Sequence, residues 1–144
     1  MRKINKIILH CTATPEGRDV SVNTIRQWHL DRGWSDIGYH YVVGLDGKVE
    51  EGRSVRRSGA HVRGHNKGSI GITYVGGVDS NMNPKDTRTE FQKNGLETLI
   101  IDLMNKYPNS TLHGHNEFSS KACPSFDVQK EYENIIKDFK ECEY

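Results

Sequence analysis

Runs of apolar residues along the chain predict two central strands, and a short third strand is predicted farther along. The run at 7–9 is short, rich in β-branched residues and uninterrupted, which is typical of a strand covered on both faces, and it ends next to His10. A second run at 69–75 predicts another central strand, which is ended by a pair of glycines. Residues 111–115 predict a short third strand. We expect functional residues at the ends of these strands and in loops.

A hairpin is predicted between the first two of these strands. Residues 39–45 and 48–49 flank Asp46-Gly47, a dipeptide that tolerates the positive φ angles of a tight two-residue turn. Residues 53–68 carry arginine, histidine and glycine without periodicity, so we expect a surface loop there.

Apolar residues at helical spacing predict three helices. Ser21 can cap the first, which ends at Gly33. Thr89 and Gln92 have the spacing of a capping box at the start of the second, and Asp127 can cap the third. The predicted inward-facing residues are Val22, Ile25, Trp28, His29, Leu96, Leu99, Ile100, Leu103, Met104, Val128, Tyr132, Ile135, Ile136 and Phe139.

The predicted order is strand, helix, hairpin, strand, helix, strand, helix. This order fits an α/β fold with a central mixed β-sheet flanked by helices. The length of 144 residues suits one domain that buries its own core, so we expect a single domain over residues 1–144.

Composition excludes several classes of partner. With 20 basic and 19 acidic side chains the net charge is +1, so we expect no nucleic-acid partner. No run approaches the roughly 20 apolar residues of a membrane span, and the basic N-terminus lacks the apolar stretch of a signal peptide. The cysteines at 11, 123 and 142 show no disulfide spacing, which favours free thiols and synthesis in the cytoplasm.

Histidine and cysteine side chains offer the ligands of a metal site. Imidazole nitrogen and thiolate sulfur are favoured by zinc, and a catalytic zinc usually takes three protein ligands. His10, His115 and Cys123 could supply that set. His113 and His115, alternate residues of one strand, form a rival pair. Each of these residues is also common in a purely structural role, and spacing alone does not choose among these interpretations.

Four separated blocks together resemble one known family. They are IILHCTAT at 7–14, GYHYVVGLDGKVEEGR at 38–53, HNKGSIGITYVGG at 65–77 and HNEFSSKACPSFD at 115–127. In this order and spacing they look like the phage-lysozyme type of N-acetylmuramoyl-L-alanine amidase, a zinc fold shared with peptidoglycan recognition proteins. The similarity runs over nearly the whole chain.

The resemblance implies one zinc ion per chain, held by His10, His115 and Cys123. Amidases of this fold that recycle wall fragments in the cytoplasm generally place an aspartate where this chain has Cys123. The cysteine therefore favours the wall-lysing branch. Lys121 precedes it by two residues, and Pro124 stiffens the turn beside the thiolate.

The resemblance also implies catalytic roles for Tyr39 and Lys121, which match a tyrosine and a lysine beside the metal. A phenol, an ammonium and zinc can all stabilise the negative charge that develops on the carbonyl oxygen during amide hydrolysis. Without the resemblance, Tyr39 is typical of a strand aromatic half in the core, and Lys121 of a solvated loop charge. His61 matches a position near the substrate groove, which implies substrate binding.

Four further residues near these blocks have other expected roles. His40 points away from Tyr39 along the strand, which favours a structural role. Cys11 is expected to be a buried thiol facing away from the site, and Cys142 to take no part in it. Glu117 could hydrogen-bond to a metal ligand and orient it without binding the metal itself.

The function implied is that of a zinc hydrolase that cuts the amide bond between N-acetylmuramic acid and L-alanine. We expect a monomeric phage or prophage endolysin that binds peptidoglycan, does not insert into the membrane, and reaches the cell wall after the membrane is permeabilised. Three rivals are a non-catalytic peptidoglycan-binding module, a regulator of an RNA polymerase, and an amidase of cytoplasmic wall-recycling fragments. Only six residues precede Ile7, fewer than in the typical phage member, so we do not expect the polymerase partner.

Overall fold

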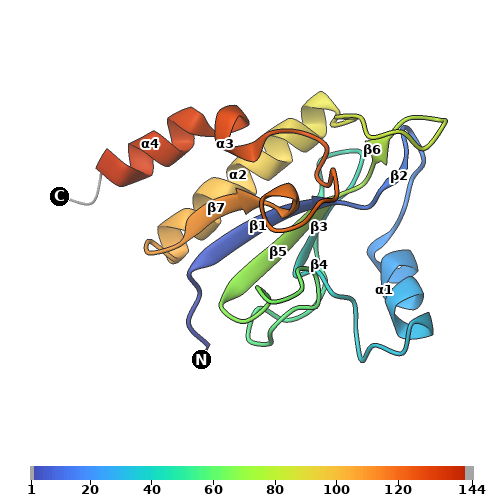
Figure 1. Cartoon of the computed structure of the whole chain (residues 1–144), viewed down its shortest axis with the longest axis horizontal. Helices are drawn as coiled ribbons and strands as arrows, with labels where there is room; N and C mark the ends of the chain where they lie inside the picture. Colours follow the sequence, from blue (N-terminus) through green and yellow to red (C-terminus); the bar gives the residue numbers. More distant parts are fainter. Residues whose placement is uncertain (1, 142–144) are drawn as a thin grey trace.

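The computed structural model describes residues 2–141 and contains a five-stranded mixed sheet (Figure 1). The strands are β1 (Lys6–Cys11), β2 (Thr14–Pro15), β3 (Tyr41–Val43), β4 (Val49–Glu51), β5 (Ser69–Tyr74), β6 (Gly77–Val78) and β7 (Thr111–Gly114). The helices are α1 (Val22–Asp31), α2 (Glu90–Lys106), the 3₁₀ turn η1 (His115–Glu117), α3 (Val128–Glu131) and α4 (Glu133–Glu141). Within the described residues, no helix has the length and apolar composition that a bilayer span requires.

The sheet has the order β4-β3-β5-β1-β7, with β1 at the centre between two parallel neighbours. Strand β3 is also parallel to β5, and only β4 runs antiparallel, as the second arm of a hairpin. The predicted mixed sheet flanked by helices is confirmed. Because parallel strands end at the same edge, the residues that follow β1, β5 and β7 are brought together.

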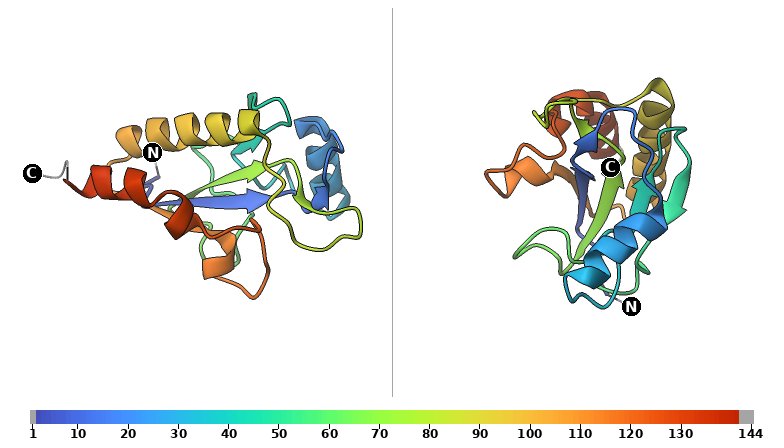
Figure 2. Two further views of the ribbon diagram at one scale, coloured as in Figure 1. Left: turned by 90° about the horizontal axis from the view of Figure 1, so that it is seen from above. Right: turned by 90° about the vertical axis from the view of Figure 1, so that its right-hand side faces the viewer.

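Helix α2 covers one face of the sheet, and α1 lies near the carboxyl ends of the central strands (Figure 2). Successive strand residues point to opposite faces, so Ile7, Leu9 and Cys11 pack in the core with α2 while His10 points to the other face. The core that α2 shares with the strands includes Ile70, Ile72, Tyr74, Leu96, Leu99, Ile100, Leu103 and Met104. The face that α2 leaves uncovered is therefore the face that carries His10.

The predicted two-residue hairpin turn is wrong. The last paired residues are Val43 and Val49, so residues 44–48 form the connection. A tight turn at Asp46-Gly47 needs positive φ at both residues, but only Gly47 has it, with φ of 82°. The side chain of Asp46 instead accepts a hydrogen bond from the backbone of Lys48 at 2.9 Å, which stabilises a wider loop.

The C-terminal prediction of one helix is also wrong, because the helix breaks at Tyr132. Asp127 caps α3 as predicted, accepting from the backbone N–H of Lys130 at 3.2 Å. The Tyr132 hydroxyl lies 3.2 Å from a guanidinium nitrogen of the buried Arg88, and α4 begins one residue later. After this break, the short helix α3 lies beside β7.

Candidate functional site

The carboxyl ends of β1 and β7 bring three of the predicted residues together. His10 lies at the end of β1, and His115 begins η1 directly after β7. Cys123 comes from the loop that follows η1. One ligand atom from each of these three side chains lies within 4.8 Å of the others.

The loop that carries Cys123 is tied to the end of β1. The Cys123 Sγ accepts a hydrogen bond from the backbone N–H of Cys11 at 3.1 Å and lies 3.8 Å from the Nδ1 of His10. The next residue is held as well, because the Tyr74 hydroxyl donates to the carbonyl of Pro124 at 2.7 Å. The thiol is therefore aimed at the imidazole rather than left in solvent.

Burial keeps the imidazoles of this cluster neutral. His10 is 1% exposed, and burial, followed by the charges of His61, His115 and Lys121, lowers its pKa well below the ordinary value. Burial and the Lys121 charge lower the pKa of His115 in the same direction. A neutral imidazole has a free lone pair, which is the form that binds a metal ion.

The donor set fits a zinc ion. The ligand atoms of a tetrahedral zinc site lie roughly 3.3–3.8 Å apart, given bond lengths of about 2.0–2.3 Å. The distance from His10 Nδ1 to Cys123 Sγ is 3.8 Å, which already lies in that range. The other ligand atoms are no more than 4.8 Å apart, so they need to move together only slightly to bind zinc. The Cys11 side chain and burial raise the pKa of the Cys123 thiol, so a metal would have to displace its proton.

Tyr39 stands beside the cluster with its phenol protonated. Its ring centroid is 5.1 Å from that of His10, and burial raises its pKa above the ordinary value. His29 fixes the backbone just before it, because the His29 Nδ1 accepts from the N–H of Gly38 at 2.8 Å. Tyr39 is therefore a hydrogen-bond donor held next to the cluster.

Lys121 is exposed, yet its charge reaches the cluster. It lowers the pKa values of His10 and His115 and favours the thiolate of Cys123. The ammonium is thus close enough to act on a negative charge that forms there. Its exposure leaves it free to move toward such a charge.

The rival pair of histidines is not brought together on one strand face. β7 ends at Gly114, one residue before His115, so the predicted strand over 111–115 is one residue too long. Both ring nitrogens of His113 are engaged, by Thr111 Oγ1 at 2.7 Å and by Glu117 Oε1 at 2.9 Å. Glu117 thus binds His113 rather than a member of the cluster.

Comparison with known proteins identifies the family to which the chain belongs. A family model described as N-acetylmuramoyl-L-alanine amidase matches residues 1–126. The chain belongs to this amidase family. It is 41% identical over 132 residues to the endolysin of Klebsiella phage KP32. This alignment covers 92% of this chain and 87% of that protein.

Two solved structures at 30% identity resemble the amidase over most of its length. The amidase LysC from Clostridium intestinale has a TM-score of 0.77 and covers 90% of this chain and 82% of its own. Bumblebee peptidoglycan recognition protein SA has a TM-score of 0.73, and the match covers 93% of this chain and 83% of that protein. The predicted family, fold and N-acetylmuramoyl-L-alanine amidase activity, of the phage endolysin type, are confirmed.

Sequence reasoning missed Thr73, which lies beside His10 of the cluster. The sheet register pairs Thr73 on β5 with His10 on β1. Its buried hydroxyl has no hydrogen-bond partner of ordinary geometry among the described residues, although it lies close enough to Tyr39 to offset part of the rise that burial causes in the pKa of that phenol. A buried hydroxyl without a partner calls for an explanation, and a site that holds another group supplies one. The available signal was a lone threonine inside an apolar run.

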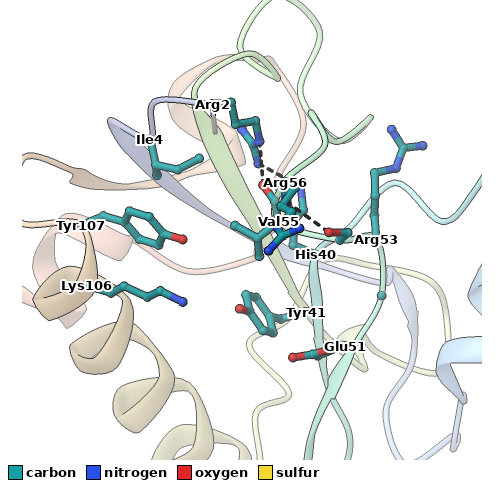
Figure 3. Close-up of a pocket in the computed structure, with 12 residues that line it drawn as sticks. Arg2, Ile4, His40, Tyr41, Glu51, Arg53, Val55, Arg56, Lys106 and Tyr107 are labelled. Carbon is teal, nitrogen blue, oxygen red and sulfur yellow. Dashed lines mark hydrogen bonds between the residues drawn. The ribbon is translucent and has the colours of Figure 1, made fainter.

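A separate pocket of about 400 Å³ lies at the amino ends of β1 and β3, away from the cluster (Figure 3). Arg2, Tyr41, Lys106 and Tyr107 are among its lining residues, and the Nε of Arg2 donates to the carbonyl of Val55 at 2.8 Å. None of the three cluster residues lines it. This pocket is therefore distinct from the cluster of His10, His115 and Cys123.

His40 lies between that pocket and His61. It lines the pocket, and its ring centroid is 5.9 Å from that of His61. Its Nδ1 accepts from the N–H of Gly71 at 3.0 Å, and its Nε2 lies 2.8 Å from the carbonyl of Arg57 and 3.1 Å from a guanidinium nitrogen of Arg2. Both nitrogens thus contact backbone groups, in keeping with the structural role expected for His40.

Cys11 contacts Cys123 through its backbone but is not one of the expected ligands. Cys11 is buried in the core that α2 shares with the strands, on the face opposite His10, as expected. Cys142 lies outside the described residues.

Proposed function

We propose that the chain is a zinc-dependent endolysin in which His10, His115 and Cys123 hold one zinc ion and Tyr39 and Lys121 assist catalysis. The observation that carries the proposal is the convergence of two neutral imidazoles and a thiol within 4.8 Å, with a phenol and an ammonium beside them. The bound zinc would supply a Lewis acid that activates water and polarises the substrate carbonyl.

The chain's own residues would stabilise the charge that develops as the amide is cut. The protonated phenol of Tyr39 can donate a hydrogen bond to the carbonyl oxygen as it becomes negative. The ammonium of Lys121, exposed beside the cluster, can approach the same oxygen. Both groups act more strongly on the transition state than on the neutral amide, as catalysis requires.

We further infer that residues 1–144 act as one amidase domain and as a monomer. The protein would be made in the cytoplasm and would reach peptidoglycan once the membrane has been permeabilised. The similarity to phage endolysins over 92% of the chain supports this setting. Cys123, in place of the aspartate of the recycling enzymes, supports intact wall as the substrate over soluble wall fragments.

The bond that is cut can be identified from the products. Incubation with purified sacculi is expected to release peptides that begin with a new amino-terminal alanine, and to leave glycan chains uncut. Soluble anhydro-muropeptides are expected to be poorer substrates. Binding to sacculi without new amino termini would favour the non-catalytic binding module, and faster cleavage of the soluble fragments would favour the recycling role. Capture of an RNA polymerase in a pull-down would favour the regulator.

The choice between His113 and His115 gives a prediction about the metal ligands. His115→Ala is expected to lose zinc and activity, because it removes one of three ligands. His113→Ala is expected to keep most of both, because the His113 ring is bound to Thr111 and Glu117. Zinc content and peptide release measured on both variants check this, and the reverse pattern would assign the wrong histidine to the metal.

A further inference from the structure

The imidazole of His61 links the metal cluster to the backbone of its own loop. Its Nδ1 lies 2.8 Å from the Nε2 of His10, and its Nε2 lies 3.2 Å from the hydroxyl of Ser69. The Ser69 hydroxyl in turn donates to the carbonyl of Asn66 at 3.2 Å. These contacts form one continuous chain from a candidate zinc ligand to a carbonyl group.

The carbonyl at the end of this chain sets the direction of every hydrogen bond in it. A carbonyl only accepts, so the Ser69 hydroxyl donates its single proton to the Asn66 carbonyl. The hydroxyl oxygen is then left to accept from the Nε2–H of His61. The Nδ1 of His61 is then without a proton and accepts from the Nε2–H of His10. This leaves the lone pair of His10 on Nδ1, the nitrogen that lies 3.8 Å from Cys123 Sγ.

The protein makes room for the His61 ring and holds its backbone. A side chain on Gly71 would lie 2.6 Å from the ring, and one on Gly59 would lie equally close, so the absence of both lets the imidazole reach His10. The side chain of Asn66 accepts from the N–H of His61 at 2.8 Å. The ring is thus built into the site rather than left on a free loop.

We propose that His61 is a positioning residue that fixes the tautomer and orientation of His10 for zinc, instead of the substrate-binding residue that the sequence predicted. The inference rests on the proposed zinc function. Groups that accept the outer N–H of a zinc-bound histidine typically contribute 10–100-fold to metal affinity or activity. His61 would be such a group.

The test compares two replacements of His61 for zinc affinity, measured by competition with a chelator of known affinity. His61→Leu removes the acceptor and is expected to weaken zinc binding about 10–100-fold. His61→Asn places an amide oxygen near the position of Nδ1 and is expected to restore most of the affinity. The matched control is His65→Leu in the same loop, whose ring packs on Phe118 and should leave zinc affinity unchanged.

Each result has a distinct meaning. Wild-type zinc affinity in His61→Leu, with a raised KM for peptidoglycan, would overturn the positioning role and return His61 to substrate binding. An equal loss in His61→Leu and His61→Asn would also overturn it. A wild-type protein that binds no zinc would instead refute the proposed function itself.

A second measurement needs no variant. In the zinc-loaded wild-type protein, long-range proton–nitrogen correlation spectra of the histidine rings report which nitrogen carries the proton. His61 is expected as the Nε2–H tautomer and His10 as protonated on Nε2 with Nδ1 bound to the metal. A proton on the Nδ1 of His61 would reverse the chain and overturn the proposal.

Discussion

Cys123→Ser is expected to leave the amidase with little zinc and correspondingly little activity. A hydroxyl is a poor replacement for a thiolate on zinc. Structural sites with four ligands bind zinc with about 10–16 kcal/mol, or roughly 2.5–4 kcal/mol per ligand, so loss of one ligand should weaken binding on the order of a hundredfold or more. Zinc content after dialysis and the rate of peptide release from sacculi measure the effect.

The neighbouring Cys11 provides the matched control for this prediction. Its thiol is buried in the core on the opposite face of β1 from His10 and is not a member of the three-residue cluster. Its backbone N–H and carbonyl lie 3.1 and 3.8 Å from the Cys123 Sγ, and its side chain affects the pKa of that thiol. Cys11→Ala should therefore cost some stability through lost packing while zinc and activity are kept. Full zinc occupancy in Cys123→Ser would remove the thiol from the ligand set.

Tyr39→Phe and Lys121→Ala are expected to form a different class, in which zinc is retained and turnover falls. Neither side chain is one of the three ligands proposed for the metal. Removal of one donor to a developing oxyanion typically costs about 10²–10³ in rate, so kcat should fall by on the order of a hundredfold in each variant. Zinc content and binding to sacculi should change little.

Two nearby residues of the same type serve as controls. Tyr41→Phe alters a tyrosine that lines the separate pocket of about 400 Å³, and Lys130→Ala removes an exposed lysine on α3. Both are expected to keep near-normal turnover. If Tyr39→Phe and Lys121→Ala also keep near-normal turnover, neither residue assists catalysis. Tyr39 would then serve packing alone, and Lys121 would be a solvated surface charge.

Local patterns were sufficient where one short signal determines the structure. The capping box of Thr89 and Gln92 is formed by both reciprocal hydrogen bonds, and Ser21 caps α1 as predicted. Short, mainly apolar runs marked β1 and β5 because strands at the centre of a parallel sheet are buried on both faces. These features depend on residues that are neighbours in the chain.

Sequence patterns were insufficient where distant residues decide the outcome. The break at Tyr132 accompanies its contact with Arg88, which lies 44 residues away along the chain. The role of His61 depends on Ser69 and on two glycines that leave space for its ring, and no local pattern reports such space. Spacing alone also left His113 and His115 as rivals, because their relation depends on where β7 ends, and strand ends are weakly specified by sequence.

The most direct test of the central claim is the zinc content of the purified amidase measured together with its activity. The account predicts about one zinc per chain, loss of peptide release from sacculi when zinc is removed by a chelator, and recovery when zinc is added back. A preparation that contains no metal and cleaves peptidoglycan at the full rate would contradict it.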